Sequence, residues 1–149
     1  AAGKRDEAEP LLVELLQRES NNAGANVAMA RLMASKGEVA DAASYYHRSL
    51  YGVWPGNSAR SRRSVRMELI EFLVKSGRTR ELLAELLPLE QEGEEGNGDM
   101  AFKKRIAHLF LLAGSPSRAA DAYRSLIRKD SQDADLYSGL GEADLAAGQ

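Results

Sequence analysis

A glycine recurs at similar intervals along the chain, each time at the end of a stretch with helical periodicity. Gly37, Gly77, Gly114 and Gly148 are 40, 37 and 34 residues apart. Mostly apolar residues stand four, seven and eight positions before these glycines, on one face of a helix. After the first three glycines, a second face follows at positions five, nine and twelve. The repeating unit is therefore predicted to be a helix, a turn with glycine in the left-handed conformation, and a second helix.

The two predicted faces recur in order along the chain. Small residues among them, such as Ala30 and Ala42, allow the helices of a hairpin to approach closely. The first face comprises Met29, Ala30 and Met33, then Leu69, Ile70 and Leu73, then Ile106, Ala107 and Phe110, and finally Leu140, Gly141 and Asp144. The second face comprises Ala42, Tyr46 and Ser49, then Leu82, Leu86 and Leu89, then Ala119, Tyr123 and Leu126.

This pattern resembles the tetratricopeptide repeat, a helix pair of 34 residues with small and aromatic residues at fixed positions. Residues 99–133 form the best copy and residues 23–57 a second one. Residues 58–98 form a degenerate copy, because Ile70 and Leu82 replace small residues. The resemblance implies an all-α fold, an α-solenoid of antiparallel helix hairpins that forms a right-handed superhelix.

The large residue that opens such a repeat is matched only at Tyr137. Asn26, Arg66 and Lys103 stand at the corresponding positions of the other copies.

Both ends of the sequence read as half of a repeat. Residues 4–20 show the second-helix spacing through Ala8, Leu12 and Leu15, and residues 134–149 show the pattern of a first helix. Repeat arrays normally end in polar caps, which are absent here. We expect the natural protein to continue beyond both ends. The same apolar helix faces leave self-association by stacking on another copy as an open alternative.

Two longer connections interrupt the repeats. Residues 50–58 contain Pro55 and Gly56, which disfavour a helix, followed by Asn57 or Ser58 as the cap of the next one. Residues 91–99 are predicted to be a flexible acidic loop that ends at an N-cap, Asp99. Ser115 and Pro116 are predicted to be a cap and the first helical residue.

The composition argues against catalysis and against nucleic-acid binding. Twenty Lys and Arg against 22 Asp and Glu give a net charge of −2, whereas phosphate binding requires a cationic surplus. Cysteine is absent, and His47 and His108 are 61 residues apart, so no metal-ligand motif is formed. The longest strongly apolar run, residues 109–113, is too short to span a membrane. We expect no enzyme activity, no metal and no cofactor.

The resemblance also implies a binding surface. In tetratricopeptide proteins the first helices line a concave groove that holds an extended or helical segment of a partner. Here an apolar seam would run beside a polar row of both charges, which suits a mixed amphipathic ligand. One subclass binds the terminal carboxylate of its partner with Lys, Arg and Asn on consecutive first helices, but Arg31 and Glu71 stand at the asparagine positions here. The predicted groove residues are Val27, Arg31, Met67, Glu71, Val74, Lys104, His108, Leu111 and Glu142.

Two further groups are secondary candidates for partner contact. Trp54 and Tyr51 lie in the longest connection, and such residues are frequent in binding hot spots. The alternative is that Trp54 packs back on Tyr46 or Leu50. Arg62, Arg63 and Arg66 begin a helix where cations are unfavourable, so they serve a partner or simply balance acidic residues nearby.

These observations favour a protein–protein interaction scaffold, or adaptor, with no catalysis. A helical-repeat RNA-binding module, in which each repeat reads one base, is the first alternative. A regulatory segment of a larger multidomain protein is the second. The sequence identifies neither the partner protein or peptide nor the cellular compartment.

Overall fold

The computed structural model describes residues 2–95 and 99–148, and all regular structure in these residues is helical. One isolated bridge between Asn22 and Val53 is the only β-type pairing in these two ranges. No helix in the described residues is both long and apolar enough to cross a membrane. The helices are α1 (Ala2–Arg18), α2 (Ala23–Lys36), α3 (Val39–Leu50), a 3₁₀ turn η1 (Pro55–Asn57), α4 (Ala59–Lys75), α5 (Thr79–Glu95), α6 (Met100–Leu112), α7 (Pro116–Ile127) and α8 (Ala134–Ala146). The predicted all-α fold is confirmed.

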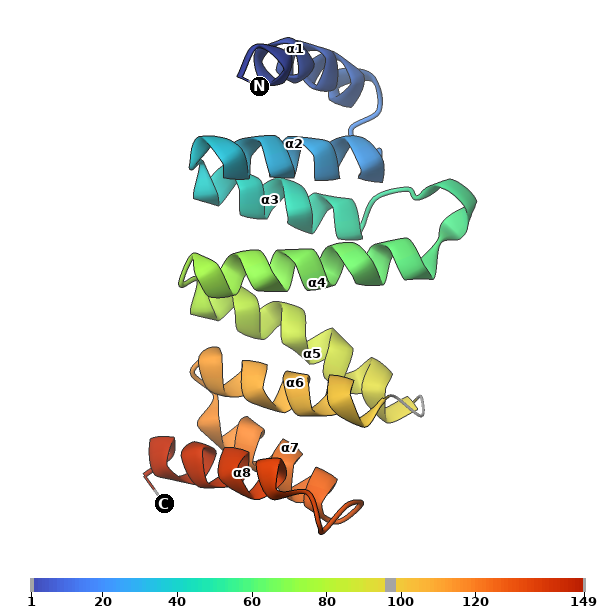
Figure 1. The fold of residues 1–149 in the computed structure, drawn as a ribbon. Helices are drawn as coiled ribbons and strands as arrows, with labels where there is room; N and C mark the ends of the chain where they lie inside the picture. The colour runs from blue at the N-terminus through green and yellow to red at the C-terminus, as the bar shows by residue number, and fades with distance from the viewer. Residues whose placement is uncertain (1, 96–98, 149) are drawn as a thin grey trace. The chain divides into compact units, whose positions relative to one another are not determined.

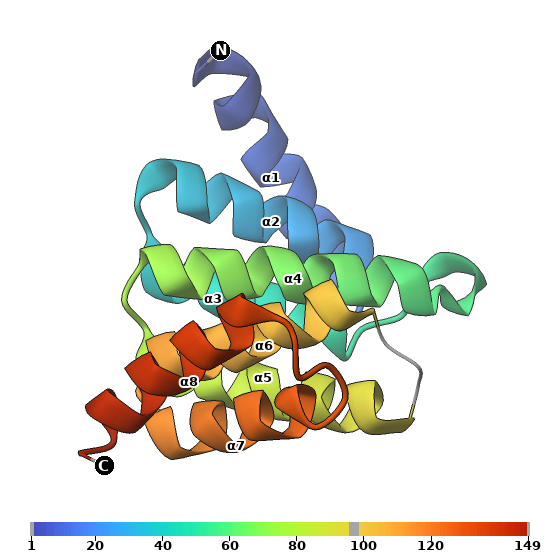
Figure 2. The ribbon, with the colours of Figure 1, turned by 60° about the horizontal axis from the view of Figure 1, so that its bottom comes forward.

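The chain divides into two units, Ala1–Ser76 and Gly77–Gln149. In unit 1, α1 packs on α2, α2 on α3 and α3 on α4 (Figure 1). In unit 2, α6 packs on α5 and α7, while α8 packs mainly on α7 (Figure 2). Consecutive helices are therefore neighbours within each unit, as the helix-hairpin pattern predicts.

The four recurring glycines adopt the left-handed conformation, with φ between 67° and 79°. At Gly37, the glycine N–H bonds to the Ala34 carbonyl and the following N–H bonds to the Met33 carbonyl, at 3.1 and 3.0 Å. The turn at Gly114 repeats this arrangement. These bonds satisfy carbonyls that the helix end leaves without partners, so the predicted glycine caps are confirmed.

Polar side chains cap several helix starts. Ser58 accepts a hydrogen bond from the Ser61 N–H at 3.1 Å, and Asp99 accepts one from the Ala101 N–H at 3.1 Å. Of the two residues proposed to cap α4, the structure therefore selects Ser58, and the predicted cap at Asp99 is confirmed. Ser115 and Pro116 also take their predicted places, although the Ser115 side chain makes no capping hydrogen bond.

Both predicted faces are buried in the first three repeats. The fourth copy differs, because Gly141 is exposed and Leu140 and Asp144 are half-buried. The buried residues of α8 are instead Leu136, Gly139 and Ala143. A first helix has one face toward the preceding helix and another toward its own partner. In α8 the face toward α7 is the buried one.

Two other predictions need correction. In α1, Leu12 and Leu16 pack on the core around Met29 and Met33, whereas Leu15 is exposed, so the buried spacing is i, i+4 and not i+3. Residues 91–95 of the predicted acidic loop are helical, because α5 continues through Pro88 to Glu95. Glu and Gln are good helix formers, which accounts for the extension. Residues 96–98 of that predicted loop lie outside the described residues.

Candidate functional site

A three-residue polar cluster joins three helices of unit 1. The guanidinium of Arg31 on α2 donates through Nε and Nη2 to the two carboxylate oxygens of Glu68 on α4, both at 2.8 Å. The hydroxyl of Tyr46 on α3 donates to Oε1 of the same carboxylate at 2.8 Å. A bidentate Arg–carboxylate pair is geometrically specific. The cluster therefore sets the register of α2, α3 and α4.

The cluster changes the acid–base properties of its members. Hydrogen bonding from Arg31 lowers the pKa of the Glu68 carboxyl below its ordinary value, with Tyr46 adding to the effect. Burial raises the pKa of the Tyr46 hydroxyl, and its bond to Glu68 raises it further. Glu68 is thus ionised in the folded chain, and Tyr46 keeps its proton.

Replacing Glu68 with glutamine is expected to destabilise unit 1 by about 1 kcal/mol at pH 7, since one charged, partly exposed acceptor is lost. Because the pKa of the Glu68 carboxyl is lower in the folded state, the carboxylate contributes its full stabilisation at any pH above the unfolded-state pKa. The penalty should therefore shrink as pH falls below 4.5, the ordinary value for this carboxyl, and vanish once pH is below the lower folded-state pKa. Trp54, the single tryptophan, lies in unit 1 and reports unfolding in urea by its fluorescence.

Glu14→Gln is the matched control for this prediction. Glu14 bonds to Arg18 at 2.7 Å, one turn away on the exposed surface of α1. Its loss is expected to change unit 1 by less than about 0.5 kcal/mol at any pH. A Glu68→Gln penalty that persisted unchanged at pH 3 would contradict the linkage to ionisation.

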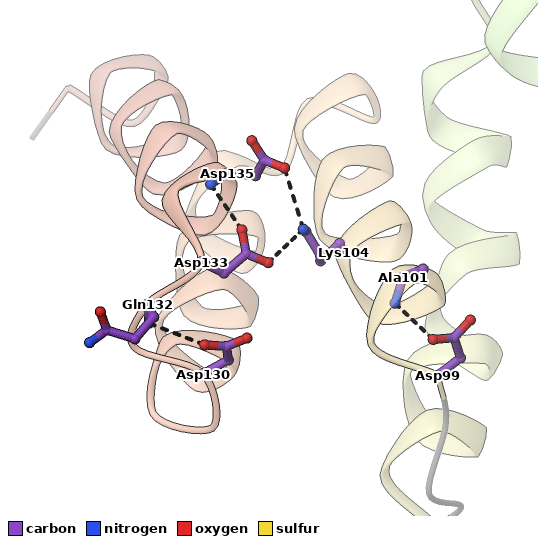
Figure 3. A network of polar contacts seen from close by, with 7 residues as sticks. All are labelled: Asp99, Ala101, Lys104, Asp130, Gln132, Asp133 and Asp135. Carbon is purple, nitrogen blue, oxygen red and sulfur yellow. Dashed lines mark hydrogen bonds and ion pairs between the residues drawn. The ribbon is translucent and has the colours of Figure 1, made fainter.

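A second polar cluster lies between α6 and the start of α8 in unit 2 (Figure 3). The ammonium of Lys104 contacts the Asp133 carboxylate at 2.6 Å and the Asp135 carboxylate at 3.5 Å. The other Asp133 oxygen accepts the Asp135 N–H at 3.0 Å and so caps α8. Lys104 lowers the pKa of the Asp133 carboxyl, and Asp133 raises that of Lys104. Lys104, a predicted groove residue, is thus engaged within the chain.

Two tyrosines at equivalent repeat positions contact different residues in units 1 and 2. Tyr46 and Tyr123 each stand nine residues after a cap glycine, and Glu68 and Gly139 each stand nine before the next one. Tyr46 meets a carboxylate on the following first helix. Tyr123 lies over a glycine, where an added methyl group would come within 2.3 Å of its ring. Glycine at 139 therefore makes room for the Tyr123 ring.

The other predicted groove residues differ in accessibility. On α4, Glu71 is exposed while Met67 and Val74 are half-buried, and the three share one helix face. In unit 2, His108 and Glu142 are exposed and Leu111 is half-buried. Val27 is only 5% exposed. Its side chain belongs to the packing of α2, so it provides almost no surface for a partner.

The secondary candidates differ in their contacts and in their exposure. The indole N–H of Trp54 donates to the Ser49 carbonyl at 3.0 Å, so Trp54 is anchored to the end of α3 through Ser49. Tyr51 is exposed, and its ring lies 4.9 Å from that of His47. The three arginines fall into three classes: Arg63 is exposed, Arg62 half-buried and Arg66 only 7% exposed.

Sequence reasoning missed Glu68 and Asp133 as organising residues. Each pairs with a residue that was predicted to face a partner, Arg31 and Lys104 respectively. The available signal was position, because Glu68 lies on the first helix that follows Tyr46 and Asp133 precedes α8. Within the described ranges, no group of three or more His, Asp or Glu side chains could hold a metal ion.

Glycine-capped helix hairpins, packed in chain order and carrying exposed polar side chains, define a helical-repeat protein. Residues 1–50, which include α1, α2 and α3, match the tetratricopeptide repeat family. This family indicates a protein-interaction module. No curated protein matches the chain.

Proposed function

We propose that this chain is a non-catalytic adaptor that binds a segment of a partner protein on the exposed faces of its first helices. The observation that carries the proposal is the face of α4 on which Met67 and Val74 remain half-buried beside exposed Glu71. Apolar side chains flanked by charge suit an amphipathic segment. The tetratricopeptide match over residues 1–50 supports the same reading.

In unit 2, the predicted groove residues are His108 and Leu111 on α6 and Glu142 on α8; Leu111 is half-buried, and the other two are exposed. Preformed helices require little ordering when they bind, so the partner segment bears most of the entropic cost. Lys104 is left out of the proposed contacts because it pairs with Asp133.

Site-specific photocrosslinking in the native host tests the proposal. A benzophenone amino acid would replace Ser64, which precedes Met67 on the same face of α4, or His108 on α6. The matched controls are Ser44 on α3 and Ser117 on α7, which are exposed on second helices. We expect one protein product from the first-helix positions, at least tenfold stronger than from the controls.

Met67→Glu is expected to reduce the Ser64 crosslink at least fivefold, since it places a charge in the apolar part of the face. Lys75→Glu, on the exposed end of α4, should leave the yield unchanged. Equal crosslinking from second helices would overturn the proposal. Crosslinking to RNA would favour the nucleic-acid alternative instead.

A further inference from the structure

A cavity of about 320 Å³ opens between α5 and α7, above α6, and lies wholly within unit 2. Its floor is apolar and is formed by Leu89, Ile106, Phe110 and Leu126, all buried in the fold. The volume is at the lower end of the range typical of ligand sites. The cavity lies on a different face of α6 from His108 and Leu111, so it is separate from the surface proposed above.

The cavity lies beside a position where this chain departs from the repeat pattern. Lys103 stands where the tetratricopeptide pattern usually has a large residue, and a lysine extends its charged end toward water and does not fill the space below. In unit 1, Asn26 stands at the same position, and the corresponding cavity measures about 200 Å³. There Tyr45 and Arg48 border the space, whereas unit 2 has Ala122 and Ser125. Small side chains on α7 therefore leave the unit 2 cavity open.

The rim of the cavity has unbalanced cations. Lys103, Arg128 and Lys129 border it, and none forms an ion pair with a carboxylate in the described part of the chain. Loss of solvent and the nearby ammonium of Lys129 lower the pKa of Lys103. Like charges held this close destabilise one another, so an anion between them would be favourable.

The acidic residues of the rim do not balance the charge of these lysines, because they pair with arginines instead. Glu90 pairs with Arg118 and Asp121 pairs with Arg124, each at 3.3 Å, and Arg124 also pairs with Asp144 at 2.6 Å. Above its apolar floor, the rim therefore combines carboxylates that pair with arginines and ammonium groups that pair with no carboxylate in the described ranges.

We propose that this cavity binds an acidic peptide segment of a partner protein, with one large apolar side chain on the floor and a carboxylate between Lys103 and Lys129. The volume suits a single side chain, and the exposed rim leaves the peptide backbone in water. Charge complementarity selects an acidic segment, because the apolar floor alone would accept any hydrophobic side chain.

A nuclear magnetic resonance titration of the ¹⁵N-labelled chain tests the proposal. The probe is the capped pentapeptide Asp-Glu-Phe-Asp-Glu, and the matched peptides replace Phe with Ala or the four acids with their amides. We expect saturable shifts in α6 and in the second half of α7, with an affinity at least tenfold higher than for either matched peptide. The affinity should fall as salt is added.

Lys103→Glu and Lys129→Glu are each expected to weaken the probe at least tenfold, and Ser125→Phe should do so by filling the cavity. Lys75→Glu is the matched charge reversal in unit 1 and should change nothing. The spectra of the free variants check folding. Absence of saturation, equal binding of the amide peptide, or identical shifts with inorganic phosphate alone would each overturn the proposal. Crosslinking at His108 does not depend on these lysines, so the two proposals fail separately.

Discussion

Replacement of Phe110 with alanine is expected to destabilise unit 2 by about 3–5 kcal/mol, the usual cost of removing a buried aromatic ring. Phe110 is fully buried on α6, where it lines the cavity together with residues of α5 and α7. The cavity beside it is already open, so the neighbouring side chains have little means of closing the additional void. A loss of this size should lower the melting temperature by about 12 °C or more.

Phe110→Leu keeps this prediction testable if the alanine variant does not fold, because the smaller change should cost about 1–2 kcal/mol. His108→Ala is the matched control, since it lies on the same helix with its side chain exposed, and it should stay within about 0.5 kcal/mol of the parent. Hydrogen exchange of amides in α6, α7 and α8 follows unit 2 directly. Unchanged protection in Phe110→Ala would show that the ring is not part of the core.

Helix positions were predictable because they depend on residues close in sequence. The spacing around Gly37 and Gly114 identifies both the helix ends and the buried faces, and all of these positions are buried. The same reasoning failed in α8, where Leu140 and Leu136 are both apolar and only packing decides which is buried. It also failed at residues 91–95, since a loss of hydrophobic periodicity does not end a helix of good helix formers.

The polar clusters were less predictable because they join residues distant in sequence. Arg31 and Glu68 are 37 residues apart, and Lys104 and Asp133 are 29 apart. Their pairing depends on the angle at which helices of neighbouring repeats cross, which a periodic pattern does not specify. The sequence located Arg31 and Lys104 on the first helices, but it could not show that each already has a carboxylate partner.

The unit 2 cavity was only indirectly visible in the sequence. Lys103 was recognised as a departure from the repeat pattern, yet the same departure occurs at Asn26, where the cavity is smaller. The difference comes from Ala122 and Ser125 on the neighbouring helix. Whether a missing large residue leaves usable space is therefore decided by its neighbours, and not by the departure itself.

Gly139→Ala and Gly141→Ala are expected to change the stability of unit 2 in opposite directions, although only one residue separates the two glycines on α8. Gly141 is exposed and a Cβ added there would meet nothing within 4 Å, so alanine should stabilise unit 2 by about 0.5–1 kcal/mol through helix propensity. At Gly139 the new methyl group would lie 2.3 Å from Cζ and 2.5 Å from Cε1 of Tyr123. The Tyr123 ring is only 5% exposed and cannot move aside freely.

Overpacking of this kind typically costs about 1–3 kcal/mol, so Gly139→Ala should be destabilising despite the gain in helix propensity. Tyr123→Leu removes the two ring atoms that clash. In that background Gly139→Ala should become as stabilising as Gly141→Ala, and thermal unfolding of the four variants measures the coupling directly. If Gly139→Ala stabilises the parent chain, the close packing of Tyr123 on α8 is wrong. The explanation for glycine at the place where unit 1 has Glu68 would then be lost as well.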